Sequence, residues 1–299
     1  MENALYDYWP ISDRPKIEWP SGARMAFWLG LNIEYYEVDK ASTSIFPTTA
    51  ALSPDPLNYG WRDYGPRVGL WRIAEILEEH HVRASVLLNS DVCAHYPQII
   101  ELGNERGWTW LAHGKNNSTM QSGFTEDEER SYLVEVIETL RVGTGQAPKG
   151  WLGPALTETY DTPRLLCELG LSYICDWCSD DQPFPLVIPG KKMISMPYSI
   201  EVNDISLFVG KNLAGEDFYR LVMDQFESLY TASSANGLVM SLALHPFVIG
   251  QPFRLKYLKK ILASIAATSD VWIATSDEIA DFYFENYYDL AVASISKKR

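Results

Sequence analysis

Polar side chains that could carry chemistry stand where two apolar runs of the sequence end. Asn32 and Glu34 close the run 25–33, and His113 follows the run 108–112. A carboxylate and an imidazole that come from two separate strands could hold a metal ion or activate a water molecule. The question is whether the sequence offers a third ligand.

The position that would supply this ligand, four residues after His113, is Asn117. An amide is a poor ligand for zinc. We therefore expect Asn117 to bind substrate or to stabilise an oxyanion.

A second histidine follows a third apolar run. His245 comes directly after 238–244 and precedes Pro246 and a Gly-Gln-Pro loop at 250–252. His245 could be a core histidine whose ring is hydrogen-bonded to a backbone carbonyl. Its position at the end of an apolar central strand favours a functional role instead. Asp180 and Asp181 follow a fifth run, where they could equally cap a helix or mark a turn before Pro183.

These polar groups lie on a sequence in which short apolar runs alternate with helical patterns. Helical periodicity covers 66–81, 96–106, 125–141, 162–169, 216–231, 254–267 and 276–288. Strand-like runs cover 25–33, 82–88, 108–112, 150–152, 171–175, 193–196, 238–244 and 271–274. About eight such alternations predict an α/β fold, with a parallel sheet covered by helices and closed or nearly closed into a barrel. Reactive groups of such barrels collect at the carboxyl ends of the strands.

The chain is expected to form one domain over residues 1–299. Two segments fall outside the alternation: an N-terminal arm at 1–22, rich in proline and aromatic residues, and a long loop at 38–64. A loop of that length is usually a lid or an oligomer contact.

The net charge of −14 and a sequence pI of about 4.8 argue against binding to nucleic acid or to an anionic membrane surface. Residues 1–16 resemble no signal peptide, and no segment has the length of a transmembrane helix. We expect a soluble, cytoplasmic protein with a small-molecule substrate. Apolar surface on the arm (Tyr6, Tyr8, Trp9 and Trp19) and on 45–61 predicts a homodimer or homotetramer.

Several motifs together resemble the polysaccharide deacetylase (NodB-homology) superfamily, and more narrowly its branch of cofactor-independent allantoinases and bacterial cyclic imide hydrolases. The segments that carry the resemblance are Trp-Pro-Ser-Gly-Ala-Arg at 19–24, Asn-Ile-Glu at 32–34, Leu-Ala-His-Gly at 111–114, Gly-Trp-Leu-Gly-Pro at 150–154, Thr-Glu-Thr-Tyr-Asp-Thr at 157–162, 176–183, and His-Pro at 245–246 with Ile-Gly-Gln-Pro at 249–252. The resemblance implies a distorted (β/α) barrel of about seven parallel strands. It also implies a hydrolase that cleaves an amide-type carbon–nitrogen bond.

The chain departs from the family pattern where the family holds its metal. Metal-dependent members use paired aspartates on the first strand and His-x-x-x-His on the third, and the matching positions here are Asn32 with Glu34 and His113 with Asn117. The arginine usual in the next motif has no counterpart, because Trp151 stands near its position. Two remaining ligands would bind a catalytic divalent metal weakly, so we expect no metal or other cofactor.

The hypothesis for function is therefore metal-free ring opening of a cyclic amide, imide or ureide. Glu34 orients a water molecule that Glu34 or His113 deprotonates, and His245 protonates the leaving nitrogen. The remaining candidates are Asp181 or Asp180, to orient His245 or bind ring N–H groups; Asn32 and Asn117, to bind the oxyanion; and Trp151 and Trp177, to form the walls for a planar ring.

Two other functions remain open. One is a metal-dependent N-deacetylase of an acetylated sugar or small amide, with zinc bound through Glu34, His113 and a further ligand. The other is an inactive barrel that only binds a ligand.

Overall fold

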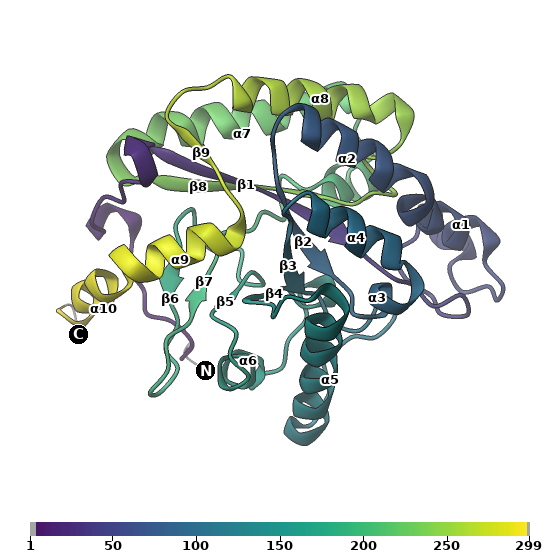
Figure 1. The fold of residues 1–299 in the computed structure, drawn as a ribbon, viewed down its shortest axis with the longest axis horizontal. Helices are drawn as coiled ribbons and strands as arrows, with labels where there is room; N and C mark the ends of the chain where they lie inside the picture. The colour runs from purple at the N-terminus through teal and green to yellow at the C-terminus, as the bar shows by residue number, and fades with distance from the viewer. Residues whose placement is uncertain (1–3, 298–299) are drawn as a thin grey trace.

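A computed structural model describes residues 4–297, and its strands form one curled sheet (Figure 1). The order of the strands is β6-β7-β5-β4-β3-β2-β1-β8, with β9 paired to β1. All pairs are parallel except β6 with β7. The strands are β1 Met25–Ile33, β2 Ala84–Leu88, β3 Thr109–Ala112, β4 Gly150–Trp151, β5 Tyr173–Ile174, β6 Phe184–Pro185, β7 Ile194–Ser195, β8 Leu238–Leu244 and β9 Val271–Ile273.

The two long strands, β1 and β8, lie side by side and are buried along their whole length. Their unbroken apolar sequences fit this position, because a parallel strand covered on both faces has no exposed side that would favour polar residues. The predicted (β/α) barrel is confirmed. Between β6 and β8, the ends of the strand order, no pairing occurs within residues 4–297, so the barrel has an open edge.

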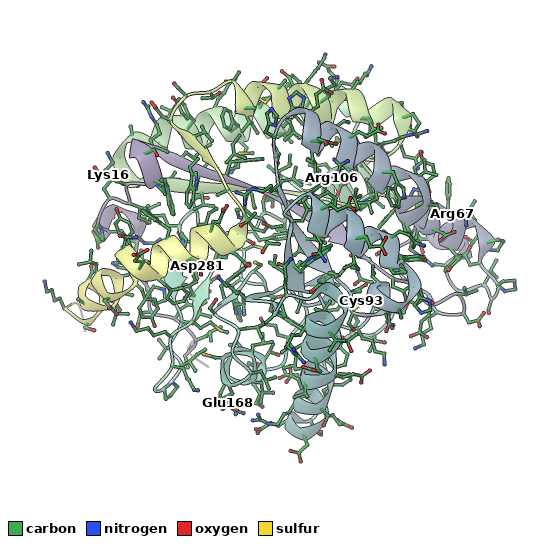
Figure 2. The ribbon with its side chains drawn as sticks, in the orientation of Figure 1. Lys16, Arg67, Cys93, Arg106, Glu168 and Asp281 are labelled. Atoms are coloured by element: carbon green, nitrogen blue, oxygen red, sulfur yellow. The ribbon has the colours of Figure 1, made fainter. Side chains whose placement is uncertain are left out.

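Helices cover the outer face of the sheet. In Figure 1, α7 and α8 lie over β8 and β1, and Figure 2 shows side chains filling the space between helices and strands. The helices are α1 Pro56–Tyr64, α2 Leu70–Glu79, α3 Asp91–His95, α4 Pro97–Glu105, α5 Glu126–Thr144, α6 Thr162–Glu168, α7 Gly215–Asn236, α8 Pro252–Ala266, α9 Ser276–Asn286 and α10 Tyr288–Ser296. Two of them, α5 and α9, begin with a capping box, formed by Thr125 with Glu128 and by Thr275 with Glu278.

The structure adds elements where the sequence showed only loop. Helix α1 occupies the end of the long segment 38–64, and the two-residue strand β6 lies in a segment with no strand-like pattern. Residues 1–3 of the predicted arm and 298–299 of the predicted domain lie outside the described residues. That the chain forms one domain stays a prediction.

The arm before β1 runs across the open edge of the barrel. Leu5 accepts a hydrogen bond from Val187, just after β6, and Ile17 donates one to Asn236, just before β8. Trp9 and Trp19 are buried among side chains of the barrel interior. These tryptophans contribute to the core of this chain, so they do not offer the exposed apolar surface that the sequence suggested.

The loop after β8 packs tightly against the start of α2. A Cβ atom at Gly69 or at Gly250 would fall on the backbone oxygen of Pro246. Both positions therefore require glycine for this close approach. The tight packing holds Pro246 in place, and with it the preceding residue, His245.

Among the described helices, none is long and apolar enough to span a bilayer.

Candidate active site

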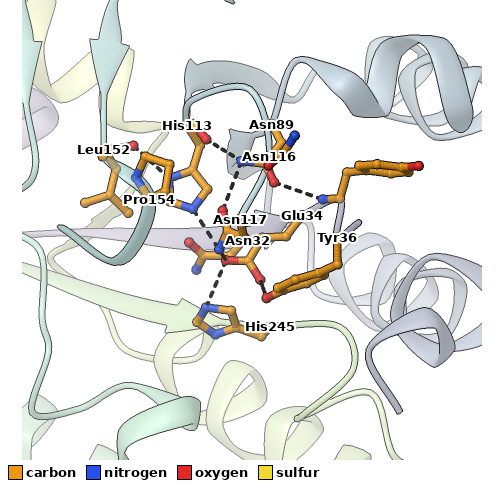
Figure 3. A network of polar contacts seen from close by, with 12 residues as sticks. Asn32, Glu34, Tyr36, Asn89, His113, Asn116, Asn117, Leu152, Pro154 and His245 are labelled. Carbon is orange, nitrogen blue, oxygen red and sulfur yellow. Dashed lines mark hydrogen bonds and ion pairs between the residues drawn. The ribbon is translucent and has the colours of Figure 1, made fainter. Parts of the chain in front are cut away.

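The carboxyl ends of β1, β3 and β8 meet at one end of the barrel. The register pairs Leu31 of β1 with Leu244 of β8, and Leu88 of β2 with Ala112 of β3. Glu34, His113 and His245 each follow one of these strands directly, and Figure 3 shows their side chains pointing toward one another.

Glu34 is the residue on which the others converge, and its side chain is nearly buried. Its Oε1 lies 3.4 Å from His113 Nε2 and 3.8 Å from His245 Nε2, and it accepts a hydrogen bond from Asn117 Nδ2. Its Oε2 accepts one from the hydroxyl of Tyr36. Both carboxylate oxygens therefore accept from side chains of the protein (Figure 3).

His113 is held by a backbone carbonyl. Its Nδ1 lies 2.7 Å from the oxygen of Leu152. Because a carbonyl only accepts, the proton must be on Nδ1. The other ring nitrogen, Nε2, is the atom that faces Glu34.

The amide of Asn117 is oriented through Asn89, which the sequence analysis missed. Asn89 Oδ1 accepts from the backbone N–H of Tyr35 at 2.9 Å, and its Nδ2 donates to the backbone oxygen of His113. These two backbone groups fix which end of the Asn89 amide is which. Asn89 Nδ2 therefore donates to Asn117 Oδ1 at 3.1 Å, and Asn117 must present its NH₂ group to Glu34.

His245 has a carboxylate partner that the sequence analysis also missed, Asp204. Asp204 Oδ1 lies 2.7 Å from His245 Nδ1, and Oδ2 accepts from the backbone N–H groups of His245 and Ile249. Asp204 is fully buried. The pair points His245 Nε2 toward Glu34 and favours the charged imidazolium.

The environment moves the pKa values of Glu34 and His245 in opposite directions. Burial by itself raises the pKa of Glu34, but the charges of His245 and His113 and the hydrogen bonds from His113 and Tyr36 outweigh it, and the net pKa is lowered. Burial by itself lowers the pKa of His245, but the carboxylates of Asp204 and Glu34 outweigh it, and the net pKa is raised. Both shifts favour the ionised forms, a carboxylate at Glu34 and an imidazolium at His245.

These residues do not fit the divalent metal of the metal-dependent relatives. Asn117 offers N–H donors where a ligand needs a lone pair, and both oxygens of Glu34 already accept hydrogen bonds. Within residues 4–297, no group of three His, Cys, Asp or Glu side chains is arranged to hold a metal ion.

Asn32 lies beside the site, but its donors are engaged. Its Nδ2 donates to the Tyr198 hydroxyl at 3.3 Å and to the Leu244 oxygen at 3.2 Å. Both N–H groups of the amide have acceptors, which argues against Asn32 as an oxyanion donor.

The two tryptophans expected as walls of the site lie elsewhere. Trp151 is fully buried in the core between the sheet and the helices. Successive residues of a strand point to opposite faces of the sheet, and Leu152, the next residue, packs in the interior of the barrel. Trp177 donates through Nε1 to Glu158 and packs edge to face on Tyr6 of the arm.

Asp180 and Asp181 do not contact His245. Asp180 forms a two-point ion pair with Arg14 of the arm, at 2.7 and 2.5 Å. Asp181 is exposed at the same open edge of the barrel. Asp204 has the position that the sequence analysis assigned to these aspartates.

Two cavities border this region. The larger lies at the open edge of the barrel, between the arm, residues 178–185 and β8, and reaches Tyr198 without touching Glu34 or either histidine. The smaller contains Glu34 in its wall. We assign the chemistry to the smaller cavity, since it is the one that reaches the polar network.

Comparison with known proteins gives a consistent family. The family model described as polysaccharide deacetylase matches residues 61–174. A Schizosaccharomyces pombe protein named as a candidate polysaccharide deacetylase is 27% identical, with 91% of this chain and 92% of the relative covered.

Two solved structures share the fold over most of both chains. A probable polysaccharide deacetylase from Pseudomonas aeruginosa PAO1 has a TM-score of 0.83 at 25% identity, with 92% of this chain and 95% of that chain covered. A Puue allantoinase has a TM-score of 0.83 at 26% identity, with the same coverage of 92% and 95%. These comparisons match the polysaccharide deacetylase (NodB-homology) superfamily, and the likeness to an allantoinase matches its allantoinase-like branch.

Proposed function

We propose that this protein hydrolyses a carbon–nitrogen bond in a small cyclic amide, imide or ureide and so opens the ring. The names of the relatives support hydrolysis of a carbon–nitrogen bond, and the likeness to an allantoinase supports a cyclic substrate. One observation carries the proposal: Glu34 lies between two imidazoles, and an amide NH₂ group takes the place of a third metal ligand.

The base in this proposal is His113. Its Nδ1–H donates to Leu152, so the neutral ring has its lone pair on Nε2, which can accept a proton from water. The imidazolium that forms then donates from Nε2 to Glu34. Glu34 is less suited, because its oxygens already accept hydrogen bonds and its pKa is lowered. Glu34 instead orients the water and stabilises the imidazolium that forms on His113.

The reaction then proceeds in two steps. The hydroxide formed from water attacks a ring carbonyl carbon, and the carbonyl oxygen becomes an oxyanion. The second N–H of Asn117 is available to this oxyanion, and a well-placed donor contributes about 3 kcal/mol. The carbon–nitrogen bond breaks as His245 gives its Nε2 proton to the leaving nitrogen, which yields a carboxylic acid and a free N–H group.

The test is a screen of ring opening with succinimide, hydantoin, dihydrouracil and allantoin, with and without prior chelation. We expect turnover that survives chelation, and loss of at least about 100-fold in the separate variants His113→Ala and His245→Ala. Circular dichroism checks that both variants fold. Full activity in either variant would overturn these roles.

A metal-dependent N-deacetylase is the second candidate, favoured by the deacetylase names of the relatives. Near-stoichiometric zinc, with activity on an N-acetyl sugar that chelation removes and zinc restores, would establish it instead. Ligand binding without any turnover would indicate the inactive barrel.

We further propose that the protein acts in the cytoplasm as a homodimer or homotetramer. The support is apolar surface on the segment before α1 and on the first turn of α1, where Phe46, Leu52 and Leu57 are 46–60% exposed.

A further inference from the structure

The larger cavity, at the open edge of the barrel, has the size of a ligand pocket. Its volume is about 600 Å³, within the roughly 300–1,000 Å³ typical of pockets for small molecules. It is bordered by the buried stretch 239–241 of β8, by the arm, by residues 178–185 and 197–201, and by α7. The aromatic side chains of the lining are Tyr6, Tyr8, Trp9, Phe184 and Tyr198. A small molecule with an apolar body therefore fits this space.

The arm, which forms one wall of the cavity, is fixed by bonds to the barrel. Arg14 pairs with Asp180 at 2.7 and 2.5 Å and donates to the backbone oxygen of Trp9 at 2.9 and 2.5 Å. Tyr6 packs edge to face on Phe184, with ring centroids 5.1 Å apart. The cavity is therefore preformed, and a ligand would not have to order its walls.

Ser241 is the one polar residue of β8, and it borders the cavity. Val239 and Ala243, two positions away on either side, pack in the interior of the barrel, so the side chain of Ser241 points there as well. Ser241 is 5% exposed, and its hydroxyl forms no hydrogen bond within residues 4–297. A buried hydroxyl without a partner is costly, so the cavity should favour a ligand that bonds to it.

The hydroxyl of Tyr198, also in the lining, has a proton to donate. Its oxygen accepts from Asn32 at 3.3 Å and from Asn203 at 3.4 Å. The proton has no acceptor among the residues that the structure describes, and the side chain is buried. The buried side of the cavity thus offers two hydroxyl groups, on Ser241 and Tyr198, and a ligand hydroxyl could both donate to and accept from them.

The charge of the lining selects against anions. Arg14 is its one basic residue, and the guanidinium is already engaged by Asp180 and by a backbone oxygen. Three more acids line the cavity, Asp7, Asp181 and Glu201. An anionic ligand would therefore meet several carboxylates and no available cation, whereas a cationic ligand would be attracted.

Asp181 is the carboxylate that a cation can pair with. Its backbone oxygen accepts from Val239 at 2.8 Å, which holds Asp181 against the edge of β8. Its side chain forms no hydrogen bond or ion pair within residues 4–297, whereas Glu201 lies 3.2 Å from Lys211. Ser241 stands two residues further along β8 than Val239, roughly 7 Å in a strand. The carboxylate and the buried hydroxyl groups are thus separated by about the length of a small aromatic molecule.

We propose that this cavity is a second ligand site, separate from the catalytic groups, and that it binds a small aromatic amine with a hydroxyl group at its other end. The ammonium group pairs with Asp181, the ring packs on the aromatic side chains, and the hydroxyl bonds to Ser241 and Tyr198. This inference does not depend on the proposed function.

The test is calorimetric titration of the wild type with tyramine and three analogues that each change one feature. Tyrosol has no charge, 3-(4-hydroxyphenyl)propionate has the opposite charge, and phenethylamine has no hydroxyl group. We expect tyramine to bind with a Kd below about 1 mM, tyrosol at least about 10-fold more weakly, phenethylamine about 3–10-fold more weakly, and the propionate without measurable affinity. Equal binding of the propionate or of tyrosol would overturn the inference.

The variants Asp181→Asn and Ser241→Ala locate the ligand, with Asp39→Asn as the matched control. Asp39 is an exposed aspartate that forms no ion pair within residues 4–297 and lines neither cavity. The Kd of tyramine should rise at least about 10-fold in Asp181→Asn and about 3–10-fold in Ser241→Ala, and it should stay unchanged in Asp39→Asn. An equal effect of Asp39→Asn would show general attraction to an acidic protein and reject the site.

The catalytic groups provide the last comparison. His113→Ala should bind tyramine as the wild type does, and loss of binding in this variant would place tyramine at the catalytic groups and reject a separate site. A wild type that opens none of the rings would contradict the proposed function and leave the titration with tyramine intact. A wild type that opens rings but binds no tyramine would reject the second site alone.

Discussion

Asp204 contacts His245 in the way a positioning residue contacts a general acid. It accepts from Nδ1 and from two backbone N–H groups, so it fixes both the tautomer and the direction of the ring. Its charge also raises the pKa of His245, against the effect of burial. Asp204 should therefore control the pH range in which the acid is protonated.

We predict that Asp204→Asn lowers kcat/KM by about 10²–10⁴-fold. Without the carboxylate the pKa of His245 falls, so the alkaline limb of the kcat/KM profile should move to lower pH. Asp277→Asn is the control, because Asp277 is a half-buried carboxylate that accepts from Thr109 and Tyr173 away from Glu34. An unmoved alkaline limb in Asp204→Asn would contradict this account.

The sequence located part of this site. The ends of the apolar runs identified Glu34, His113 and His245, because parallel strands place such residues at one edge. Asp204 and Asn89 were missed, since a partner of an active residue has no spacing rule in the sequence. The one signal for Asp204 was an acid directly before the mostly apolar segment 205–209.

Glu158 and Asp176 join two elements beside the site. Asp176 accepts from the backbone N–H of Gly153 at 2.7 Å, next to the Leu152 carbonyl that holds His113. Burial, together with the charge of Glu129, raises the pKa of Glu158 to about 7. Burial and the neighbouring carboxyl of Glu158 also raise the pKa of Asp176.

A raised pKa of an acid reduces stability as pH increases. Between pH 4.5, the ordinary value of Glu158, and about 7, the unfolded chain loses its proton before the folded chain does. Stability falls through this window by up to about 3 kcal/mol. Glu158→Gln, which supplies a permanent donor to Asp176, should remove about 2–3 kcal/mol of the difference between pH 5 and pH 8. Urea unfolding of wild type and variant at both pH values measures this, and parallel pH dependence in the two proteins would contradict it.

At the scale of elements, long patterns were predictable and short ones were not. The limits of β1 and β8 agree with the predicted runs 25–33 and 238–244. An apolar run of that length has few alternatives to a buried strand. Strands of two residues, such as β4 and β6, contain no alternation to read. The face of β4 was therefore unpredictable, and Trp151 was assigned to the wrong side of the sheet.

Self-association is a property of the whole molecule. If the proposed oligomer forms through the segment before α1, its mass by light scattering should exceed the 33.9 kDa of one chain. Leu52→Glu and Phe46→Glu should reduce the mass to the monomer, because a charge in an apolar interface is costly. Val142→Glu is the control, since Val142 is 67% exposed on α5. A monomeric wild type would reject the proposed oligomer.

The arm across the open edge of the barrel has a consequence for the order of folding. Its residues are synthesised before the barrel, yet Arg14 pairs with Asp180, Ile17 bonds to Asn236, and Glu18 donates to the hydroxyl of Tyr287. During translation the arm has to wait for almost the whole chain, and contacts between such distant residues form slowly. Until then the open edge exposes strand backbone and apolar side chains. A chain stalled before Tyr287 should therefore be the form most in need of a chaperone.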